Sequence, residues 1–185
     1  ALAIYGSDKP DLRIDLTCTD ISGLFTESEF EPLRGQTVRA VPVTSCTLTR
    51  KQIDKLLEAC EVQSGVKSYW FKVDEKGEIS GGVAKFVQGI KAELTEKLAL
   101  APNTLVILCA GKQAVKASGV AIKTFGAACE GHMDKERYEF CWIVDFPMFE
   151  TDDETGLLEF CHNPFSMPKG GMETLLAAER GEIDP

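Results

Sequence analysis

The sequence predicts an α+β fold in which helices pack on one face of a small sheet. Between Phe25 and Glu130, stretches that resemble strands and stretches that resemble helices alternate along the chain. The strand-like stretches are rich in β-branched or aromatic residues, whereas the helix-like ones carry apolar residues at helical spacing. This order is typical of a sheet whose connecting helices cover it.

Each element has a local signal. Strands are expected at residues 37–43, 66–74 and 104–111, helices within 47–65, 90–100 and 112–129, and a short helix or coil at 81–88. Pro42 cannot donate a ladder hydrogen bond, so the first strand should end at a sheet edge or a bulge. Thr47 or Thr49 can cap the first of these helices, and Gly65 can end it.

Both ends of the chain differ from this centre because they carry loops dense in Asp, Lys, Pro, Gly, His and Asn. After a charged linker, a long strand at Tyr138–Glu150, an acidic turn and a strand at 157–161 predict a hairpin, followed by a terminal helix. We infer an insertion domain flanked by two pieces of another domain. The expected boundaries are 1–24, 25–130 and 131–185.

Composition narrows the class of protein. With 185 residues, 44% of them hydrophobic, the chain can form one large domain or two small ones. Its net charge of −9 argues against tight binding of DNA or RNA by this chain alone. It has neither a run of 18 apolar residues nor a secretory signal, and it does not begin with Met, so we expect part of a longer protein that is not in a membrane.

The seven cysteines predict a reducing compartment. They occupy positions 18, 46, 60, 109, 129, 141 and 161, and no two form a Cys-x-x-Cys pair. Zinc sites need close pairs of ligands, so no metal site is expected. Most of these cysteines lie in apolar stretches, which is typical of buried, reduced thiols in a cytoplasmic protein.

Three side chains are candidates for chemistry. His132 lies in the charged linker, where a solvated side chain is expected. His162 follows a strand end, a position from which loops present binding residues, although it could equally be a loop histidine without a role. Asp145 follows an apolar stretch, so it is either a structural carboxylate or a group that lines a site. These residues alone assign no catalytic residue.

Several motifs in the correct order resemble one family. They are "YGSDKPDLR" at 5–13, "LTRKQID" at 48–54, "WIVDFPMFE" at 142–150 and "HNPFSMPKGG" at 162–171. These motifs are similar to those of bacterial-type aspartyl-tRNA synthetases, which are class II enzymes. The centre resembles their insertion (GAD-type) domain, and the flanks resemble parts of the antiparallel class II catalytic domain.

The resemblance implies a ligase that uses ATP and magnesium to convert L-aspartate into aspartyl-adenylate and then transfers the aspartyl group to tRNA. The family is typically a cytoplasmic homodimer. Many members read His-His-Pro-Phe where this chain reads His-Asn-Pro-Phe at 162–165. The first histidine helps to bind aspartate, a role that carries over to His162, and Asn163 is a neighbour without an ionisable ring.

The same resemblance leaves two alternatives. None of the three class II motifs and no anticodon-binding barrel is recognisable in the chain, so we expect it to be inactive by itself and its metal and ATP ligands to lie elsewhere. It could instead be a non-catalytic module that binds tRNA or a protein. It could also be the insertion domain of a tRNA-dependent amidotransferase subunit, although the flanking motifs are those of the synthetases.

Overall fold

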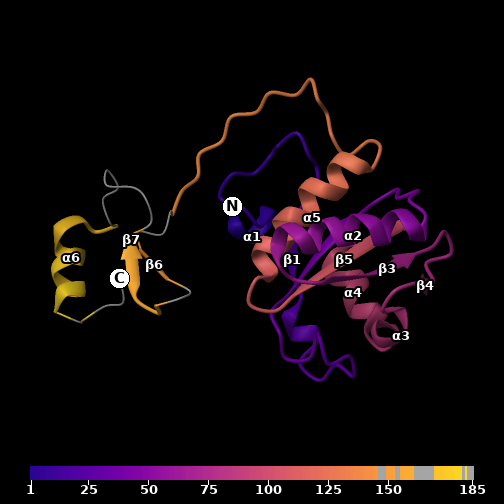
Figure 1. Ribbon diagram of the computed structural model, residues 1–185, viewed down its shortest axis with the longest axis horizontal. Helices are drawn as coiled ribbons and strands as arrows, with labels where there is room; N and C mark the ends of the chain where they lie inside the picture. The colour runs from indigo at the N-terminus through magenta and orange to yellow at the C-terminus, as the bar shows by residue number, and fades with distance from the viewer. Residues whose placement is uncertain (146–148, 153–154, 161–168, 181, 183–185) are drawn as a thin grey trace. The chain divides into compact units, whose positions relative to one another are not determined.

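The computed structural model describes residues 1–145, 149–152, 155–160, 169–180 and 182 (Figure 1). The chain divides into two compact units, Ala1–Phe140 and Cys141–Pro185. The larger unit contains a five-stranded sheet in which each neighbouring pair of strands is antiparallel. The predicted α+β class is confirmed. None of the described helices is long and apolar enough to cross a membrane.

The larger unit mixes short and long elements. Its strands are β1 (Thr19–Asp20), β2 (Val38–Val43), β3 (Ser68–Val73), β4 (Ile79–Ser80) and β5 (Thr104–Ala110). Its helices are α1 (Leu2–Tyr5), η1 (Ser22–Leu24), α2 (Arg50–Ser64), α3 (Ala84–Val87), η2 (Gln88–Ile90), α4 (Lys91–Leu98) and α5 (Ala114–Ala128). The strand order is β1-β2-β5-β3-β4, so the three predicted strands form the centre of the sheet.

Strand β5 is the middle of the sheet and is buried on both faces. All seven of its residues are buried, which agrees with its uniformly apolar sequence. The long helices α2 and α5 pack on one face. Helix α4, which was expected on the same face, instead buries Leu94 and Leu98 against the other face. The other face is covered by the region of α3 and α4 and by the segment that contains Phe25 and Leu33. Two apolar clusters, one on each side of the sheet, therefore hold this unit together.

Helix α2 begins and ends where its sequence signals predict. The Thr49 side chain accepts a hydrogen bond from the Gln52 backbone amide, while the Gln52 side chain accepts one from the amide of Thr49. This reciprocal pair is a capping box, which satisfies two amides that the first turn leaves free. Gly65 ends the helix in the left-handed conformation, with φ 79°.

The first 20 residues pack closely against α5. Ile14 and Cys18 belong to the same apolar cluster as Phe125 of that helix. The backbones of Gly6 and Gly119 approach so closely that a Cβ atom on either glycine would collide with the other residue. Helix α1 and strand β1 lie in this segment and were not predicted. The domain boundaries expected after residues 24 and 130 stay a prediction.

In the smaller unit, β6 (Phe149–Thr151) and β7 (Leu158–Phe160) form an antiparallel hairpin, and α6 (Gly171–Glu179) follows. The predicted hairpin is confirmed. The long strand expected at Tyr138–Glu150 is wrong over its described first part, because residues 138–145 are not in a strand. Phe140 is 99% exposed there. The β-branched and aromatic sequence favours a strand, but a strand also needs a pairing partner, and the described residues supply none for this segment.

We predict that Gly119→Ala destabilises the chain by about 1–3 kcal/mol, the usual range for an overpacked site. Alanine normally favours a helix over glycine, so a purely local effect would have the opposite sign. Here the new methyl group meets the backbone of Gly6. Denaturant unfolding measures the change, with Gly89→Ala as the control because a Cβ atom there meets nothing within 4 Å. Equal effects of the two variants would contradict the close packing.

Candidate functional site

The sequence placed its main candidate, His162, and the neighbouring Asn163 in the loop that follows β7. Both residues lie outside the described residues, so their predicted role stays a prediction. Asp8 and Lys9, which belong to another of the matching motifs, form an exposed ion pair at 3.8 Å. The Lys9 backbone amide also donates to the Ser7 hydroxyl at 3.0 Å. This first loop is therefore held by local contacts of its own.

Asp145 does not lie in an apolar strand, in contrast to what its neighbours in the sequence suggested. Its side chain is largely exposed and forms an ion pair with Lys169. Its backbone has φ 57°, a left-handed conformation that Asp tolerates better than most residues. The apolar neighbours misled the prediction because the segment before Asp145 is itself exposed. The burial expected for this carboxylate is therefore wrong, while its structural or site-lining role stays a prediction.

His132 is buried, in contrast to the solvated side chain that the charged linker predicted. Only 6% of the residue is exposed. Its Nδ1 lies 2.7 Å from the carboxylate of Asp15, and its Nε2 lies 2.8 Å from the backbone carbonyl oxygen of Thr44. A carbonyl can only accept, so Nε2 carries a proton and donates to it. The imidazole thereby joins three segments that are far apart in the sequence.

The surroundings of His132 favour its protonated form. Burial lowers the pKa of the imidazole, but the hydrogen bond to Thr44 and the Asp15 carboxylate together outweigh it, so the pKa is raised above its usual value. A backbone contact also joins the segments of Asp15 and His132, since the amide of Asp15 donates to the carbonyl of His132 at 3.2 Å. This histidine has the geometry of a structural link between the ends of the larger unit, with neither ring nitrogen left for a substrate.

A pair of cysteines lies close to this junction. The interaction between the two thiols lowers the pKa of Cys46 to about 6, and together with burial it raises the pKa of Cys129. The backbone amide of Cys46 donates to the carbonyl of Asn103 at 3.0 Å. Each cysteine is only 8% exposed. A reactive thiol needs access to solvent as well as a low pKa, so this pair is part of the core.

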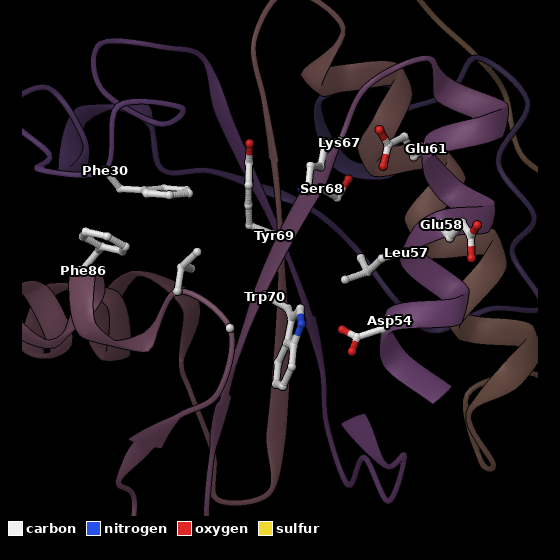
Figure 2. Close-up of a pocket in the computed structure, with 12 residues that line it drawn as sticks. Phe30, Asp54, Leu57, Glu58, Glu61, Lys67, Ser68, Tyr69, Trp70 and Phe86 are labelled. Atoms are coloured by element: carbon white, nitrogen blue, oxygen red, sulfur yellow. The ribbon is translucent and has the colours of Figure 1, made fainter. Parts of the chain in front are cut away.

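A groove of about 440 Å³ lies along the outer edge of β3, between α2 and the region of α3 (Figure 2). Strand β3 forms its floor through residues 67–70. Because successive side chains of a strand point to opposite faces, Tyr69 and Trp70 reach different sides of this floor. The groove is the candidate site in the described part of the chain.

One wall of the groove is aromatic. The ring of Phe30 stacks on that of Phe86 with centroids 4.7 Å apart, and it meets the Tyr69 ring edge-on at 5.0 Å. All three side chains are half-buried. Lys85 places its ammonium group 4.5 Å from the centre of the Phe86 ring. This wall therefore presents an apolar surface, and at its margin the Phe86 ring forms a cation–π contact with Lys85.

The opposite wall is acidic. Asp54, Glu58 and Glu61 line the groove from α2, and all three are exposed. Asp54 is paired with Arg50 at 3.7 Å, whereas among the described residues neither Glu58 nor Glu61 has a salt-bridge partner. Burial and the charge of Glu61 both raise the pKa of the Tyr69 hydroxyl. The wall formed by α2 therefore carries negative charge.

Two features of the sequence could have predicted this groove, although neither lies wholly within one of the family motifs. Its three carboxylates follow a spacing of four and then three residues, which places them on one face of a helix. The pair Gly81 and Gly82 reads as a weak phosphate motif, but in the structure both glycines pack against Trp70, where a Cβ atom would collide with the ring or the carbonyl oxygen. The glycines make room for the indole that underlies the groove.

Comparison with known proteins places this unit in a family. Residues 30–119 match the family described as the GAD domain. The chain is 44% identical over 179 residues to the aspartate–tRNA ligase of Streptomyces coelicolor, and 35% identical over 187 residues to the aspartate–tRNA(Asp/Asn) ligase of Rickettsia akari. These matches cover 95% and 96% of the chain but 30% and 31% of the relatives.

The larger unit therefore contains a GAD domain. Along nearly its whole length, the chain is similar to one region of proteins named aspartate–tRNA ligase. The resemblance inferred from the motifs is confirmed. The chain spans about 30% of the length of the curated relatives it matches.

We predict that the contribution of His132 to stability depends on pH. The folded pKa is raised above the unfolded value of 6.5, so this contribution is complete below that value and is lost as the pH rises through the folded pKa. The variant His132→Gln keeps a donor for Thr44 but has no charge. The difference in unfolding free energy between the chain and this variant should therefore shrink from acid to alkaline pH.

Chemical denaturation between about pH 5 and pH 9 measures this difference, over a range in which histidine changes charge. The control is Asp15→Asn, which removes the carboxylate 2.7 Å from the ring. In that background the pH dependence of the His132 contribution should be smaller. A difference that stays constant across the range would show that folding does not raise the pKa of His132.

Proposed function

We propose that the protein to which this chain belongs is an aspartate–tRNA ligase. It activates L-aspartate with ATP to form aspartyl-adenylate and pyrophosphate, and then transfers the aspartyl group to the 3′ end of tRNA. The observation that carries this proposal is the continuous similarity to proteins of that name, 44% identity over 95% of the chain. The four motifs at the two ends and the centre support it because they occur in the order of the family.

The proposal includes the partners that such a reaction needs. They are L-aspartate, ATP with magnesium, and tRNA, and we propose a cytoplasmic homodimer for the whole protein. Among the described residues, no group of three or more His, Cys, Asp or Glu side chains comes together in a way that could hold a metal ion. We propose that most of the groups that bind magnesium and ATP lie outside this chain, because no class II motif that would supply them is recognisable in its sequence.

Within this chain, the proposal gives a role to the motif at residues 162–171. We propose that His162 donates a hydrogen bond to the bound aspartate. Asn163 stands beside it with an amide that can both donate and accept, but it cannot hold a charge. The support for this assignment is the match of "HNPFSMPKGG" to the family motif, in which the first histidine contacts aspartate.

We expect the 185-residue chain alone to show no aspartate-dependent exchange between ATP and pyrophosphate. Adenylate formation needs cationic groups around the phosphates, and no class II motif that supplies them is recognisable in this sequence. Radiolabelled pyrophosphate exchange measures the reaction, with the full-length protein as the positive control. Exchange by the chain alone above the background without enzyme would contradict the expectation.

In the full-length protein, we predict that His162→Ala raises the KM for aspartate and lowers kcat/KM by about tenfold to a hundredfold. Loss of a hydrogen bond to a charged ligand costs about 1.5–3 kcal/mol, which corresponds to that range. The KM for ATP should stay unchanged, which separates a local effect from misfolding. Glu93→Ala, at an exposed position on α4, is the matched control. Unchanged kinetics with aspartate would remove His162 from the site.

A further inference from the structure

The indole of Trp70 is almost buried, but its Nε1 atom faces the groove between α2 and the region of α3. Only 8% of the residue is exposed, and it is one of the residues that line the groove. Among the described residues, none accepts a hydrogen bond from Nε1, yet the atom is not sealed off from solvent. Figure 2 shows it on the side of the ring turned toward α2. An indole N–H can only donate, so an occupant that pairs with it must supply an acceptor.

The wall formed by α2 requires a cation as well. Glu58 and Glu61 lie three residues apart on one side of the helix, and neither has a salt-bridge partner in the part of the chain that the structure describes. Glu61 lies in the last turn of α2, which contains no basic residue, so the partial negative charge of the helix end adds to that of the carboxylate. Asp54 contributes less, because Arg50 already pairs with it at 3.7 Å.

A ring on the other face of β3 supplies an apolar surface. Tyr69 lines the groove there, and its ring meets that of Phe30 with centroids 5.0 Å apart. Burial and the charge of Glu61 raise the pKa of the Tyr69 hydroxyl, which places this ring next to the acidic wall. Methylene groups and planar cations both pack favourably on an aromatic ring. The charge of the occupant should therefore stand on an apolar stem.

The backbone along the floor of the groove is already engaged or buried. The carbonyl of Trp70 accepts from the amide of Val83 at 2.9 Å, and Ser68 is only 4% exposed. The Ser64 hydroxyl bonds to both backbone groups of Val66. Side chains of the groove, rather than the main chain of β3, must therefore recognise the occupant.

We propose that this groove binds an arginine residue presented by a loop of a partner protein. The guanidinium group of that arginine pairs with Glu58 and Glu61. Its stem lies against Tyr69, and its backbone carbonyl accepts a hydrogen bond from Nε1 of Trp70. Arginine meets all three requirements because it combines a planar cation that can bridge two carboxylates with a methylene stem and a peptide oxygen. The groove, of about 440 Å³, has the size of a small-ligand site, so it accommodates one such residue rather than a whole helix.

Charge decides between a protein and a nucleic acid as the occupant. Lys67 is the single cation among the described residues that line the groove, against three carboxylates. A phosphate oxygen can accept from Trp70, but α2 would repel its charge, whereas the carbonyl of a protein is neutral. The chain as a whole has a net charge of −9, which attracts a basic partner from a distance.

The NMR signal of the Trp70 indole proton tests the proposal directly in the 185-residue chain. The other of the two tryptophans, Trp142, is 92% exposed in the smaller unit and serves as the internal control. Titration with the peptide acetyl-Gly-Arg-Gly-amide should move the Trp70 signal to lower field and slow its exchange with water, and it should leave the Trp142 signal unchanged. An unchanged Trp70 signal at peptide concentrations up to about 10 mM, where even millimolar affinities are populated, would overturn the proposal.

Charge variants separate this site from general attraction. The double variant Glu58→Gln, Glu61→Gln should weaken peptide binding about tenfold, from two charge contacts that each contribute modestly at an exposed site. The matched control, Glu93→Gln with Glu96→Gln, removes two carboxylates at the same spacing from exposed positions on α4 and should leave binding unchanged. Equal weakening by both pairs would overturn the proposal.

Changes to the ligand test each requirement on the occupant. Citrulline in place of arginine keeps the stem and the carbonyl but removes the charge, so that peptide should bind at least tenfold more weakly. Guanidinium chloride at the same concentration supplies the cation without a carbonyl and should leave the Trp70 signal in place. A guanidinium ion that moves this signal as the peptide does would overturn the role of the carbonyl. Bulk tRNA that moves it in the absence of peptide would overturn the assignment to a protein partner.

Discussion

The arrangement of the larger unit depends on the burial of β5. All seven of its residues are buried, so the sheet must be covered on both faces. Pairing with β2 on one side and β3 on the other satisfies its backbone, and the two apolar clusters then form against its two faces. The long helices α2 and α5 cover one face, and the shorter elements between β3 and β5 cover the other.

Because β5 is central, β2 and β3 each have an outer side that other segments must cover. On the β2 side, the two-residue strand β1 and the segment before it complete the sheet, and Gly6 and Gly119 allow that segment to lie close to α5. The buried imidazole of His132 then ties this beginning to the end of the unit. On the β3 side, β4 pairs with Lys72 and Val73 and the loop after β4 bonds to Trp70, and the acidic and aromatic groove lies along this edge.

Much of the fold could be predicted from local patterns, because β2, α2, β3, α4, β5 and α5 each carry their own periodicity and end signals. Elements that depend on distant partners could not. Strand β1 has two residues and exists only because β2 pairs with it, and the burial of His132 requires Asp15 and Thr44, far away in the sequence. Conversely, residues 138–145 have a strand pattern without a described partner. The groove was missed because its walls come from separate segments, although the family was identified from contiguous motifs.

The claim that β5 is the buried middle of the sheet is tested most directly by native-state amide hydrogen exchange of the chain. Both neighbours of a central strand pair with its backbone, so exchange of its amides requires a large opening of the unit. The account predicts that the amides of β5 are among the slowest to exchange, with an opening free energy close to that of global unfolding. Exchange of the β5 amides as fast as that of the amides of the two-residue strand β1 would contradict it.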